Sequence, residues 1–447
     1  MSETPDFLLS PRWIVTVDAD DRVLTDHVIA VRDGHILEIL PTARASTAWP
    51  HVEVHHYPEH VIMPGLVNAH THAAMSLLRG LADDLPLMEW LQEHIWPAEG
   101  KWVDEQFVHD GAELALAEML AGGTTTIMDM YFFGEVTARL CEEVGMRAVI
   151  GMILLDFPTQ YADGPDQYFE KGLALHDRYR SDHLIHTAFA PHAPYTVSDA
   201  PLEQLRTYAD ELDVPIQMHV HETQGECDRA IEAEGRRPLQ RLNELGLLSP
   251  ALSAVHMTAL TEEEIALVAE TGTHVIHSPE SNLKLASGFC PVHALQHAGV
   301  NVALGTDGAA SNNDLDMFGE MRTAALLAKA VSGEAAAVPA RVALRMATIN
   351  GARALGIGDI TGSIEPGKAA DLAAVDLGRL ESQPIYDVVS QLVYATGRHQ
   401  VTDVWVAGRQ HLREGELITL DADDIRSRTE QWRRAIAAGE SASGDAA

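Results

Sequence analysis

Four short apolar runs, far apart in the chain, each end in histidine or aspartate, and this pattern limits the folds available to it. The runs end at His70 and His72, at His219 to Glu222, at His256, and at Asp307. Alternate residues of a strand share a face, so His70 and His72 point the same way. Imidazole and carboxylate are ligands for zinc or iron, and a catalytic site leaves a position open for water. The chain therefore needs a fold that gathers the ends of several strands around one point.

From about residue 61 onward, strand-like and helix-like segments alternate. Residues 104–121 have helical apolar spacing and stop at Gly122, where a helix C-cap favours glycine, and residues 124–130 return to a strand pattern. A capping box at Thr261 to Glu264 opens a later helix. The pattern gives about eight strand–helix units in ~300 residues, the size of a (β/α)8 barrel, in which chemistry collects at the carboxyl ends of the strands. We predict the α/β class, with a TIM-type barrel over residues 61–362.

The two ends of the chain contain short alternating strands instead. Residues 12–17 and 27–32 alternate, and Asp33-Gly34 is a hairpin turn signal. Because two small sheets at opposite chain ends would be marginal alone, we predict that residues 1–60 and 363–420 form one composite β-sandwich domain. Residues 421–447 complete the chain as a C-terminal helix and tail, with an exposed helix over 423–438 and a disordered end over 439–447.

Charge and cysteine content exclude several classes of protein. The 447 residues include 66 acidic and 31 basic side chains, a formal net charge of −35, so nucleic acid and anionic membranes are disfavoured as partners. The same excess fits either a solvated, soluble surface or adaptation to a salty cytoplasm. An odd number of cysteines without metal spacing, Cys141, Cys227 and Cys290, argues against a disulfide framework. With an acidic N-terminus and no membrane-length apolar run, we expect a cytoplasmic protein.

Several motifs together resemble one enzyme superfamily. Pro-Gly-x-x-x-x-His-x-His at residues 64–72, His219 followed by Glu222, His256, and Gly-Thr-Asp-Gly around Asp307 resemble the amidohydrolase superfamily, in the mononuclear branch that deaminates nucleobases. The resemblance runs through residues 1 to about 420. Five segments resemble more narrowly the 5'-methylthioadenosine/S-adenosylhomocysteine deaminases, namely residues 71–80, 128–132, 191–195, 281–285 and 308–312.

This resemblance implies a metal centre and its catalytic groups. The implied ligands of one divalent ion per subunit are His70, His72, His219 and Asp307; zinc is the first expectation, with Fe²⁺ and Mn²⁺ as alternatives. Such an ion lowers the pKa of bound water from 15.7 toward ~7, so that hydroxide forms at neutral pH. Asp307 would also take the proton of this water. Glu222 would shuttle protons to the adenine N1 and to the departing ammonia. His256 would orient the attacking hydroxide.

The resemblance also implies contacts with a nucleoside. Glu99 matches the position that receives the ribose hydroxyls, and His192 corresponds to a nucleoside-contacting histidine, while Glu222 meets the base. Met152 falls where some relatives carry an arginine, and no clear counterpart exists to a second arginine that helps hold the homocysteine carboxylate. We therefore expect 5'-methylthioadenosine as the preferred substrate, with S-adenosylhomocysteine and adenosine weaker.

Alternatives to this function remain open at this stage. A related ring hydrolase would act on guanine, cytosine or a chlorinated triazine. A catalytically inactive barrel would serve as a scaffold, and a metal-binding protein without turnover would hold the ion but release no ammonia. We expect a small-molecule nucleoside as the partner, no nucleic acid, no membrane, and a homo-oligomer, either dimer or tetramer.

Overall fold

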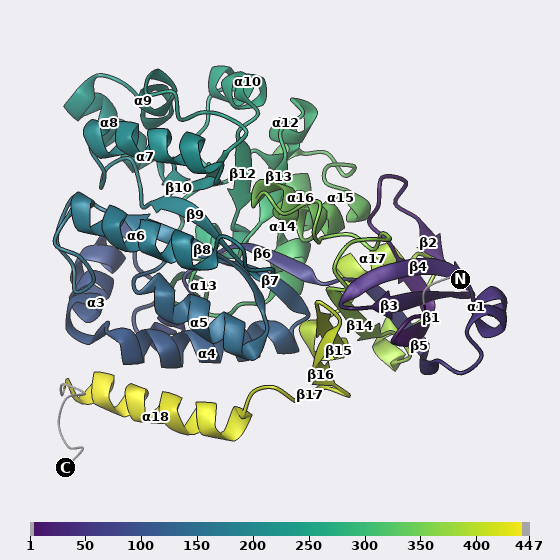
Figure 1. Ribbon diagram of the computed structural model, residues 1–447. Coiled ribbons are helices and arrows are strands. Elements are labelled where there is room, and N and C mark those ends of the chain that lie inside the picture. The colour runs from purple at the N-terminus through teal and green to yellow at the C-terminus, as the bar shows by residue number, and fades with distance from the viewer. Residues whose placement is uncertain (1–3, 440–447) are drawn as a thin grey trace, which may run out of the picture.

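The computed structural model describes residues 4–439 and consists of a parallel barrel with a mixed sheet at one end (Figure 1). The predicted disorder over 439–447 falls almost wholly outside the described residues. Eight parallel strands form the barrel in the order β13 to β6, which confirms the predicted fold class. These strands are β6 (Leu66–Thr71), β7 (Thr124–Asp129), β8 (Arg147–Leu154), β9 (Ile185–Pro191), β10 (Ile216–Val220), β11 (Leu252–His256), β12 (His274–His277) and β13 (Val302–Leu304).

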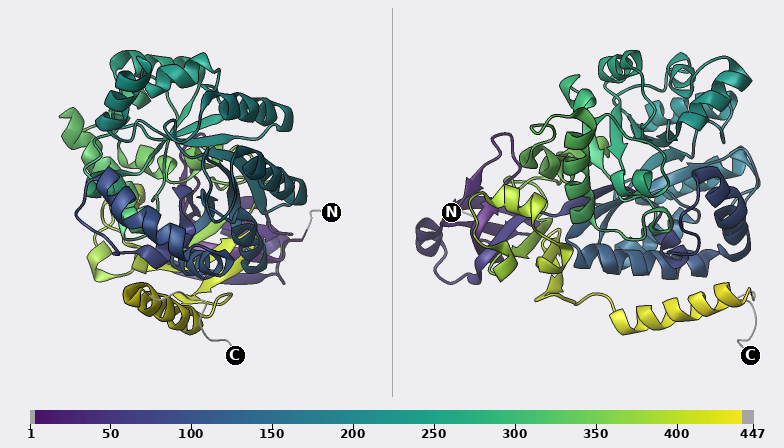
Figure 2. Two further views of the ribbon diagram at one scale, coloured as in Figure 1. Left: turned by 90° about the vertical axis from the view of Figure 1, so that its left-hand side faces the viewer. Right: turned by 180° about the vertical axis from the view of Figure 1, so that it is seen from behind.

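Helices follow the strands and cover the barrel from outside (Figures 1 and 2). They are α4 (Glu105–Ala121), α5 (Gly134–Val144), α6 (Pro165–Tyr179), α7 (Asp199–Leu212), α8 (Gln224–Glu234), α9 (Pro238–Glu244), α10 (Glu262–Thr271), α11 (Pro279–Lys284), α12 (Val292–His297), α13 (Ala309–Asn312), α14 (Met317–Ser332), α15 (Ala340–Met346) and α16 (Ile349–Ala354). The predicted capping box at Thr261 and Glu264 is confirmed at the start of α10. Asp104 caps α4, and Gly122 ends it as predicted.

Between β6 and α4 the chain forms an insertion of short helices at the carboxyl end of the barrel. It contains the 3-10 helix η1 (Ala73–Leu78), then α2 (Leu87–Glu89), the π-helix η2 (Trp90–Ile95) and α3 (Trp96–Trp102). None of these four helices has a side-chain cap. Helices this short are marginal on their own, so packing must hold them in place.

A nine-stranded mixed sheet joins the two ends of the chain, as predicted for the composite β-domain. Its strands are β1 (Phe7–Val15), β2 (Val23–Leu24), β3 (His27–Arg32), β4 (His35–Pro41), β5 (Glu53–Pro64), β14 (Leu372–Asp376), β15 (Val401–Val406), β16 (Arg409–Arg413) and β17 (Glu416–Leu417). Strand β5 pairs in parallel with β1 and antiparallel with β14, so it lies between strands from the two chain ends. Asp33 and Gly34 both have positive φ, 48° and 78°, and form the predicted hairpin turn between β3 and β4. The helices α1 (Thr42–Ala48) and α17 (Val388–Tyr394) and the 3-10 turns η3 (Leu380–Ser382) and η4 (Arg398–Gln400) accompany this sheet.

A buried ion pair joins the sheet to the barrel. The Arg147 guanidinium at the start of β8 donates to Asp371, just before β14, at 2.7 Å and 3.2 Å. Both side chains are almost fully buried, at 1% and 0% exposed. Asp371 also accepts from the backbone N–H of Ala407, so its charge is well partnered. The two parts of the molecule therefore form one continuous structure.

The C-terminal helix makes one contact that the sequence did not predict. Helix α18 (Ala422–Ala438) forms close to the predicted range, but it is not simply exposed: it runs alongside α4 (Figures 1 and 2). Ile425 and Trp432 are buried against the barrel. The sequence of this helix is strongly polar, and its two buried apolar residues, seven positions apart, form only a weak apolar stripe. The sequence pattern therefore did not indicate this contact.

Two further expectations concern cysteines and membranes. The three thiols are free and buried, in agreement with the predicted lack of a disulfide framework. Within residues 4–439, none of the helices combines the length and the apolar character needed to cross a bilayer.

Candidate active site

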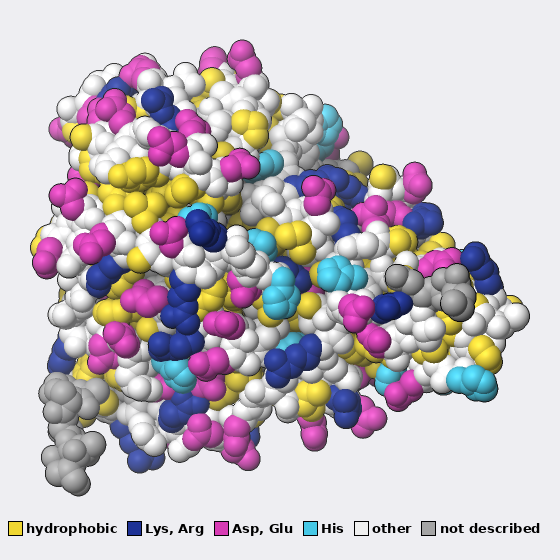
Figure 3. All heavy atoms as spheres, in the orientation of Figure 1, with side chains coloured by type: hydrophobic (Ala, Val, Ile, Leu, Met, Phe, Trp, Pro, Cys, Tyr) yellow, Lys and Arg dark blue, Asp and Glu magenta, His cyan; other side chains and the backbone are white. Residues whose placement is uncertain are grey.

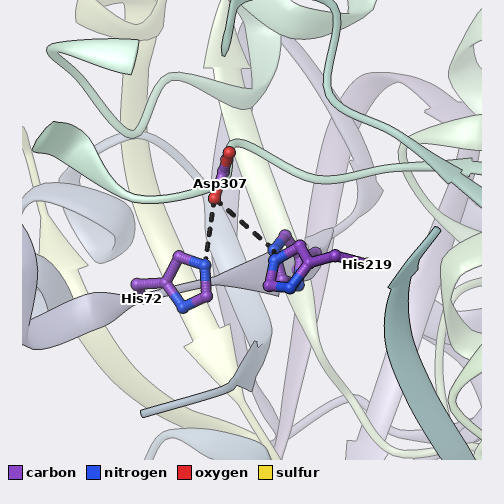
Figure 4. Close-up of side chains that lie close together, drawn as sticks. His72, His219 and Asp307 are labelled. Atoms are coloured by element: carbon purple, nitrogen blue, oxygen red, sulfur yellow. Dashed lines mark hydrogen bonds and ion pairs between the residues drawn. The ribbon is translucent and has the colours of Figure 1, made fainter. Parts of the chain in front are cut away.

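Four side chains from the ends of three barrel strands converge on one point. They are His70, His72, His219 and Asp307, and one ligand atom of each lies within 4.8 Å of all the others. Asp307 Oδ1 is 3.5 Å from His70 Nε2 and 3.2 Å from His72 Nε2. Figure 4 shows His72 and Asp307 turned toward each other beside His219. The structure thus brings together all four residues that the sequence singled out as ligands.

The close approach of β13 to β6 depends on Gly305. A Cβ at this position would lie only 2.7 Å from the backbone nitrogen of His70, so any larger residue would push the strands apart. Just beyond it, Asn68 and Thr306 exchange two hydrogen bonds, from Asn68 Nδ2 to Thr306 Oγ1 at 2.7 Å and from Thr306 N to Asn68 Oδ1 at 2.9 Å. The Asp307 backbone N–H donates to the carbonyl of His70 at 3.0 Å. These bonds fix Asp307 relative to the histidine pair.

Each of the three imidazoles is oriented through its Nδ1 atom. The acceptors are the Gln217 amide oxygen for His70 at 2.7 Å, the Met130 carbonyl for His72 at 2.5 Å and the His192 carbonyl for His219 at 2.8 Å. A carbonyl oxygen can only accept, so Nδ1 carries the proton and the Nε2 lone pair is left for a metal ion. Gln217 is itself fixed, because its Nε2 donates to the Ala69 carbonyl. This donor set, three neutral imidazoles and one carboxylate, fits a divalent ion such as zinc.

Asp307 is held as an anion. Burial alone would raise its pKa, but hydrogen bonds with His70 and His72 outweigh burial and hold the pKa well below its usual value. Two hydroxyls, from Ser281 at 2.7 Å and Ser311 at 3.1 Å, donate to Oδ2. Asp307 also has a positive φ of 63°, which is uncommon for a residue other than glycine and clusters at functional sites.

Glu222 lies just beyond β10 and is buried, at 7% exposed. Burial, reinforced by the charge of Asp307, raises the pKa of Glu222 to about 8. This carboxyl group therefore carries a proton at neutral pH. Glu226 fixes its backbone by accepting from the N–H groups of Glu222 at 2.8 Å and His221 at 3.2 Å.

His256, at the end of β11, stands between two carboxyl groups. Its Nε2 is 3.8 Å from Glu222 Oε2 and 4.0 Å from Asp307 Oδ2. Its Nδ1 is 2.9 Å from the Asn282 side-chain oxygen, which orients the ring. Burial lowers the pKa of His256, so the ring is neutral and can hydrogen-bond a water molecule placed between the carboxylates.

A cavity of about 570 Å³ opens in front of this group. One side of it is a helical wall, which we define as residues 87–102, covering α2, η2 and α3. The wall contributes chiefly apolar and aromatic side chains to the cavity: Leu87, Trp90, Leu91, Ile95, Trp96 and Val103 just beyond it. Among the residues that the structure describes, no Lys or Arg lines the cavity.

Glu99 and His192, which together with Glu222 are the predicted substrate residues, also line this cavity. Glu99, on α3, accepts a hydrogen bond from the Tyr131 hydroxyl at 2.7 Å, and burial raises its pKa to about 7. His192 lies beside His219, with ring centroids 4.9 Å apart, and its Nδ1 is 3.2 Å from Thr196 Oγ1. Burial lowers the pKa of His192 to about 3, so this ring is neutral.

Several residues that shape the site had no role in the sequence-based prediction. They are Asn68, Gln217, Glu226, Ser281, Asn282 and Ser311. Four of them left a usable signal: Ser281, Asn282 and Ser311 lie in segments that carry the family resemblance, and Gln217 lies two positions before His219 on the same strand, so those two share a face. The partners of the others are distant in sequence or depend on loop geometry.

Comparison with known proteins adds independent information. Residues 61–411 match the model of the amidohydrolase family. A 5-methylthioadenosine/S-adenosylhomocysteine deaminase of Saccharophagus degradans is 54% identical over 438 residues, covering 98% of each chain. A crystal structure of an adenosine deaminase from Xanthomonas campestris with bound zinc is also 54% identical, covers 98% of this chain and 100% of its own, and has a TM-score of 0.96. An atrazine chlorohydrolase from Arthrobacter aurescens, 22% identical over 95% of this chain and 99% of its own, shares the fold with a TM-score of 0.88.

Proposed function

Because this chain belongs to the amidohydrolase family, and within it to the 5'-methylthioadenosine/S-adenosylhomocysteine deaminases, we propose that it converts 5'-methylthioadenosine to 5'-methylthioinosine and ammonia. It is a hydrolase of C–N bonds in adenosine-type substrates. The observation that carries the proposal is the convergence of four ligand atoms beside a carboxyl group that keeps its proton.

The cofactor in this proposal is one divalent metal ion per chain, with zinc as the expected metal. His70, His72, His219 and Asp307 would hold it, each imidazole through Nε2. When bound, such an ion supplies Lewis acidity that lowers the pKa of water from 15.7 toward ~7. The zinc named for the similar Xanthomonas campestris structure supports this choice.

Three side chains would move or orient protons during the reaction. Asp307 is anionic and accepts a proton from the attacking water. Glu222 donates its proton to N1 of adenine as the water oxygen bonds to C6, and then passes a proton to the amine as the C6–N bond breaks. His256, between these two carboxyl groups, orients the water. Glu222 takes the proton for the amine from the oxygen now bonded to C6, and the proton held by Asp307 then restores the protonated Glu222, so the reaction balances.

The cavity supports a nucleoside with an uncharged 5' substituent. Glu99 would accept the two ribose hydroxyls, and His192 would contact the nucleoside beside the metal ligands. S-adenosylhomocysteine carries a carboxylate and an ammonium group, and no Lys or Arg among the described cavity residues could pair with that carboxylate. The apolar wall suits a methylthio group, so S-adenosylhomocysteine and adenosine would be weaker substrates.

We also propose a homo-oligomer, either dimer or tetramer, in the cytoplasm. The size of the barrel supports the oligomer, and the three free, buried thiols support a reducing compartment. Sedimentation equilibrium of the purified protein tests it, and a mass equal to that of one chain at all concentrations would overturn it.

An ammonia-release assay tests the proposed function directly. The substrates are 5'-methylthioadenosine, adenosine, S-adenosylhomocysteine, guanine and cytosine, with zinc-loaded and chelator-treated protein in parallel. We expect the highest kcat/KM on 5'-methylthioadenosine and loss of activity on chelation, with recovery when zinc is restored. Release from guanine or cytosine but from none of the adenosines would overturn the proposal, and comparable kcat/KM values on 5'-methylthioadenosine and S-adenosylhomocysteine would overturn the preference.

A further inference from the structure

The C-terminal helix α18 packs against α4 and against the end of α3, which is the last helix of the cavity wall. It is joined to β17 by a short connection and runs along α4 at the edge of the molecule (Figures 1 and 2). Its buried residue Trp432 is 8% exposed and belongs to the same apolar cluster as Trp90, Leu91 and Ile95 of the wall. The mechanism proposed above uses no residue of α18.

Trp432 makes specific contacts with both α4 and α3. Its indole Nε1 donates to Asp110 Oδ2 at 2.9 Å. Its ring meets Phe107 edge-on at a centroid distance of 5.3 Å and Trp102 at 6.5 Å. Trp102 is the last residue of α3, the helix that carries Glu99. Edge-to-face aromatic pairs of this kind are favourable beyond the apolar area that they bury.

Charged contacts hold the helix in this position. The Arg428 guanidinium pairs with both Asp110 and Glu113 on α4. These two carboxylates and His109 form a group of potential metal donors, but the guanidinium already provides their positive charge. Beyond them, Lys101 Nζ on α3 donates to the Gly439 carbonyl at the end of α18, at 2.6 Å. Helix α18 is therefore attached to α4 and α3 along its length.

The wall needs an external support of this kind. Helix α3 has seven residues, lacks a side-chain cap and follows a π-helical turn, so its own hydrogen bonding does not fix its position. Its inner side presents Trp96 and Glu99 to the cavity, while its end, Trp102, rests on Trp432. A shift of α3 would move the Glu99 carboxylate relative to the metal ligands.

We propose that α18 positions the cavity wall, and that Trp432 is a positioning residue that acts through α3 on Glu99. The inference rests on the proposed function, specifically on the contact of Glu99 with the ribose. This arrangement predicts that a change at Trp432 weakens nucleoside binding. It should leave the metal ligands in place, because these lie at the ends of the barrel strands.

The first experiment compares Trp432→Ala with Arg433→Ala in the full chain. Arg433 is an exposed residue of the same helix, paired with Glu430, and serves as the matched control. We expect Trp432→Ala to raise KM for 5'-methylthioadenosine by about tenfold, because a displaced Glu99 would lose part of its hydrogen bonding with the ribose, which is a loss of substrate binding. The kcat and the metal content should stay near the wild-type values. Trp432→Phe keeps the aromatic contact but loses the hydrogen bond to Asp110, so its KM should lie close to the wild-type value.

A double-mutant cycle separates positioning through Glu99 from a general loss of structure. If Trp432 acts through Glu99, Trp432→Ala should raise KM little further in a Glu99→Gln background. A wild-type KM for Trp432→Ala, independent effects of the two changes, or equal loss of kcat and bound metal would overturn the inference. A wild-type KM for Glu99→Gln alone would instead overturn the proposed ribose contact. Should Trp432→Ala fail to fold, Trp432→Leu, which keeps an apolar side chain but loses the ring contacts and the bond to Asp110, takes its place in the same cycle.

Discussion

The metal ligands and the helical wall face the same cavity but are built in opposite ways. The ligands lie at the ends of parallel strands, and a hydrogen bond at Nδ1 fixes the orientation of each imidazole. The wall, residues 87–102, consists of short uncapped helices held by apolar contacts. Strand ends in a barrel are positioned by neighbours on both sides, whereas these helices are positioned by what packs behind them. In the proposed function, the reaction chemistry therefore belongs to the strand ends and the substrate choice to helices that packing holds in place.

The comparison predicts that changes at the strand ends alter turnover or metal affinity, while changes in the wall alter substrate preference. We expect the largest effect from Glu222→Gln, which keeps the shape but cannot transfer a proton. The kcat on 5'-methylthioadenosine should fall by about 100-fold to 10,000-fold, with the metal content unchanged. Steady-state kinetics against Glu232→Gln, an exposed residue on α8, provides the control. A near-normal kcat would show that another group supplies the proton.

A smaller effect is expected when the support of one ligand is removed. Gln217→Ala leaves His70 Nδ1 without its acceptor, and the zinc dissociation constant should rise about 10-fold to 100-fold. Competition with a chromogenic chelator measures this constant without any turnover. The control is Gln204→Ala on the exposed side of α7, where the amide only contacts Tyr208. An unchanged zinc affinity for Gln217→Ala would mean that His70 does not need this orientation.

The pH dependence should report the proton on Glu222. Because the protonated form is the active one and burial raises its pKa to about 8, kcat/KM should fall as pH rises through that value. Ser287 Oγ donates to Glu222 at 3.4 Å and lowers this pKa, so Ser287→Ala should move the falling limb to higher pH. If kcat/KM stays constant at pH values well above the pKa of Glu222, the assignment of Glu222 as the proton donor is contradicted.

The smallest effect is expected from adding a charge to the cavity. Gln160 lines the cavity, and its Nε2 donates to the Gly100 carbonyl of α3. Gln160→Arg would place a cation within reach of the substrate's 5' end, and an exposed ion pair contributes only about 0.2–1 kcal/mol. The ratio of kcat/KM for S-adenosylhomocysteine to that for 5'-methylthioadenosine should therefore rise no more than about fivefold. Gln160→Leu should leave this ratio unchanged or lower it.

Much of this structure could be predicted from local sequence, because the relevant signals lie within a few residues of each other. The Asp33-Gly34 turn, the capping box at Thr261 and the strand–helix alternation are signals of this kind, and all three are confirmed. The candidate ligands meet because parallel barrel strands end on one face, a consequence of topology. Their chemical roles, and the domain boundaries, stay predictions.

The rest depended on contacts that no local pattern records. Asn68 and Thr306 are 238 positions apart, and their paired hydrogen bonds exist only once β6 and β13 are neighbours. Trp432 is 322 positions from Asp110, and the polar sequence around it predicted an exposed helix without its two buried residues, Ile425 and Trp432. Long-range pairs of this kind follow from the assembled fold, so a single sequence gives no means of placing them.

The position of β5 has a consequence for how the protein is made. This strand leads through Gly65 into the first barrel strand, and it pairs on one side with β14, whose residues are synthesised some 300 positions later. Until then a nascent chain carries β5 with an open edge, which is the kind of surface that recruits other strands. Translation must therefore pass residue 376 before that edge of the mixed sheet can close.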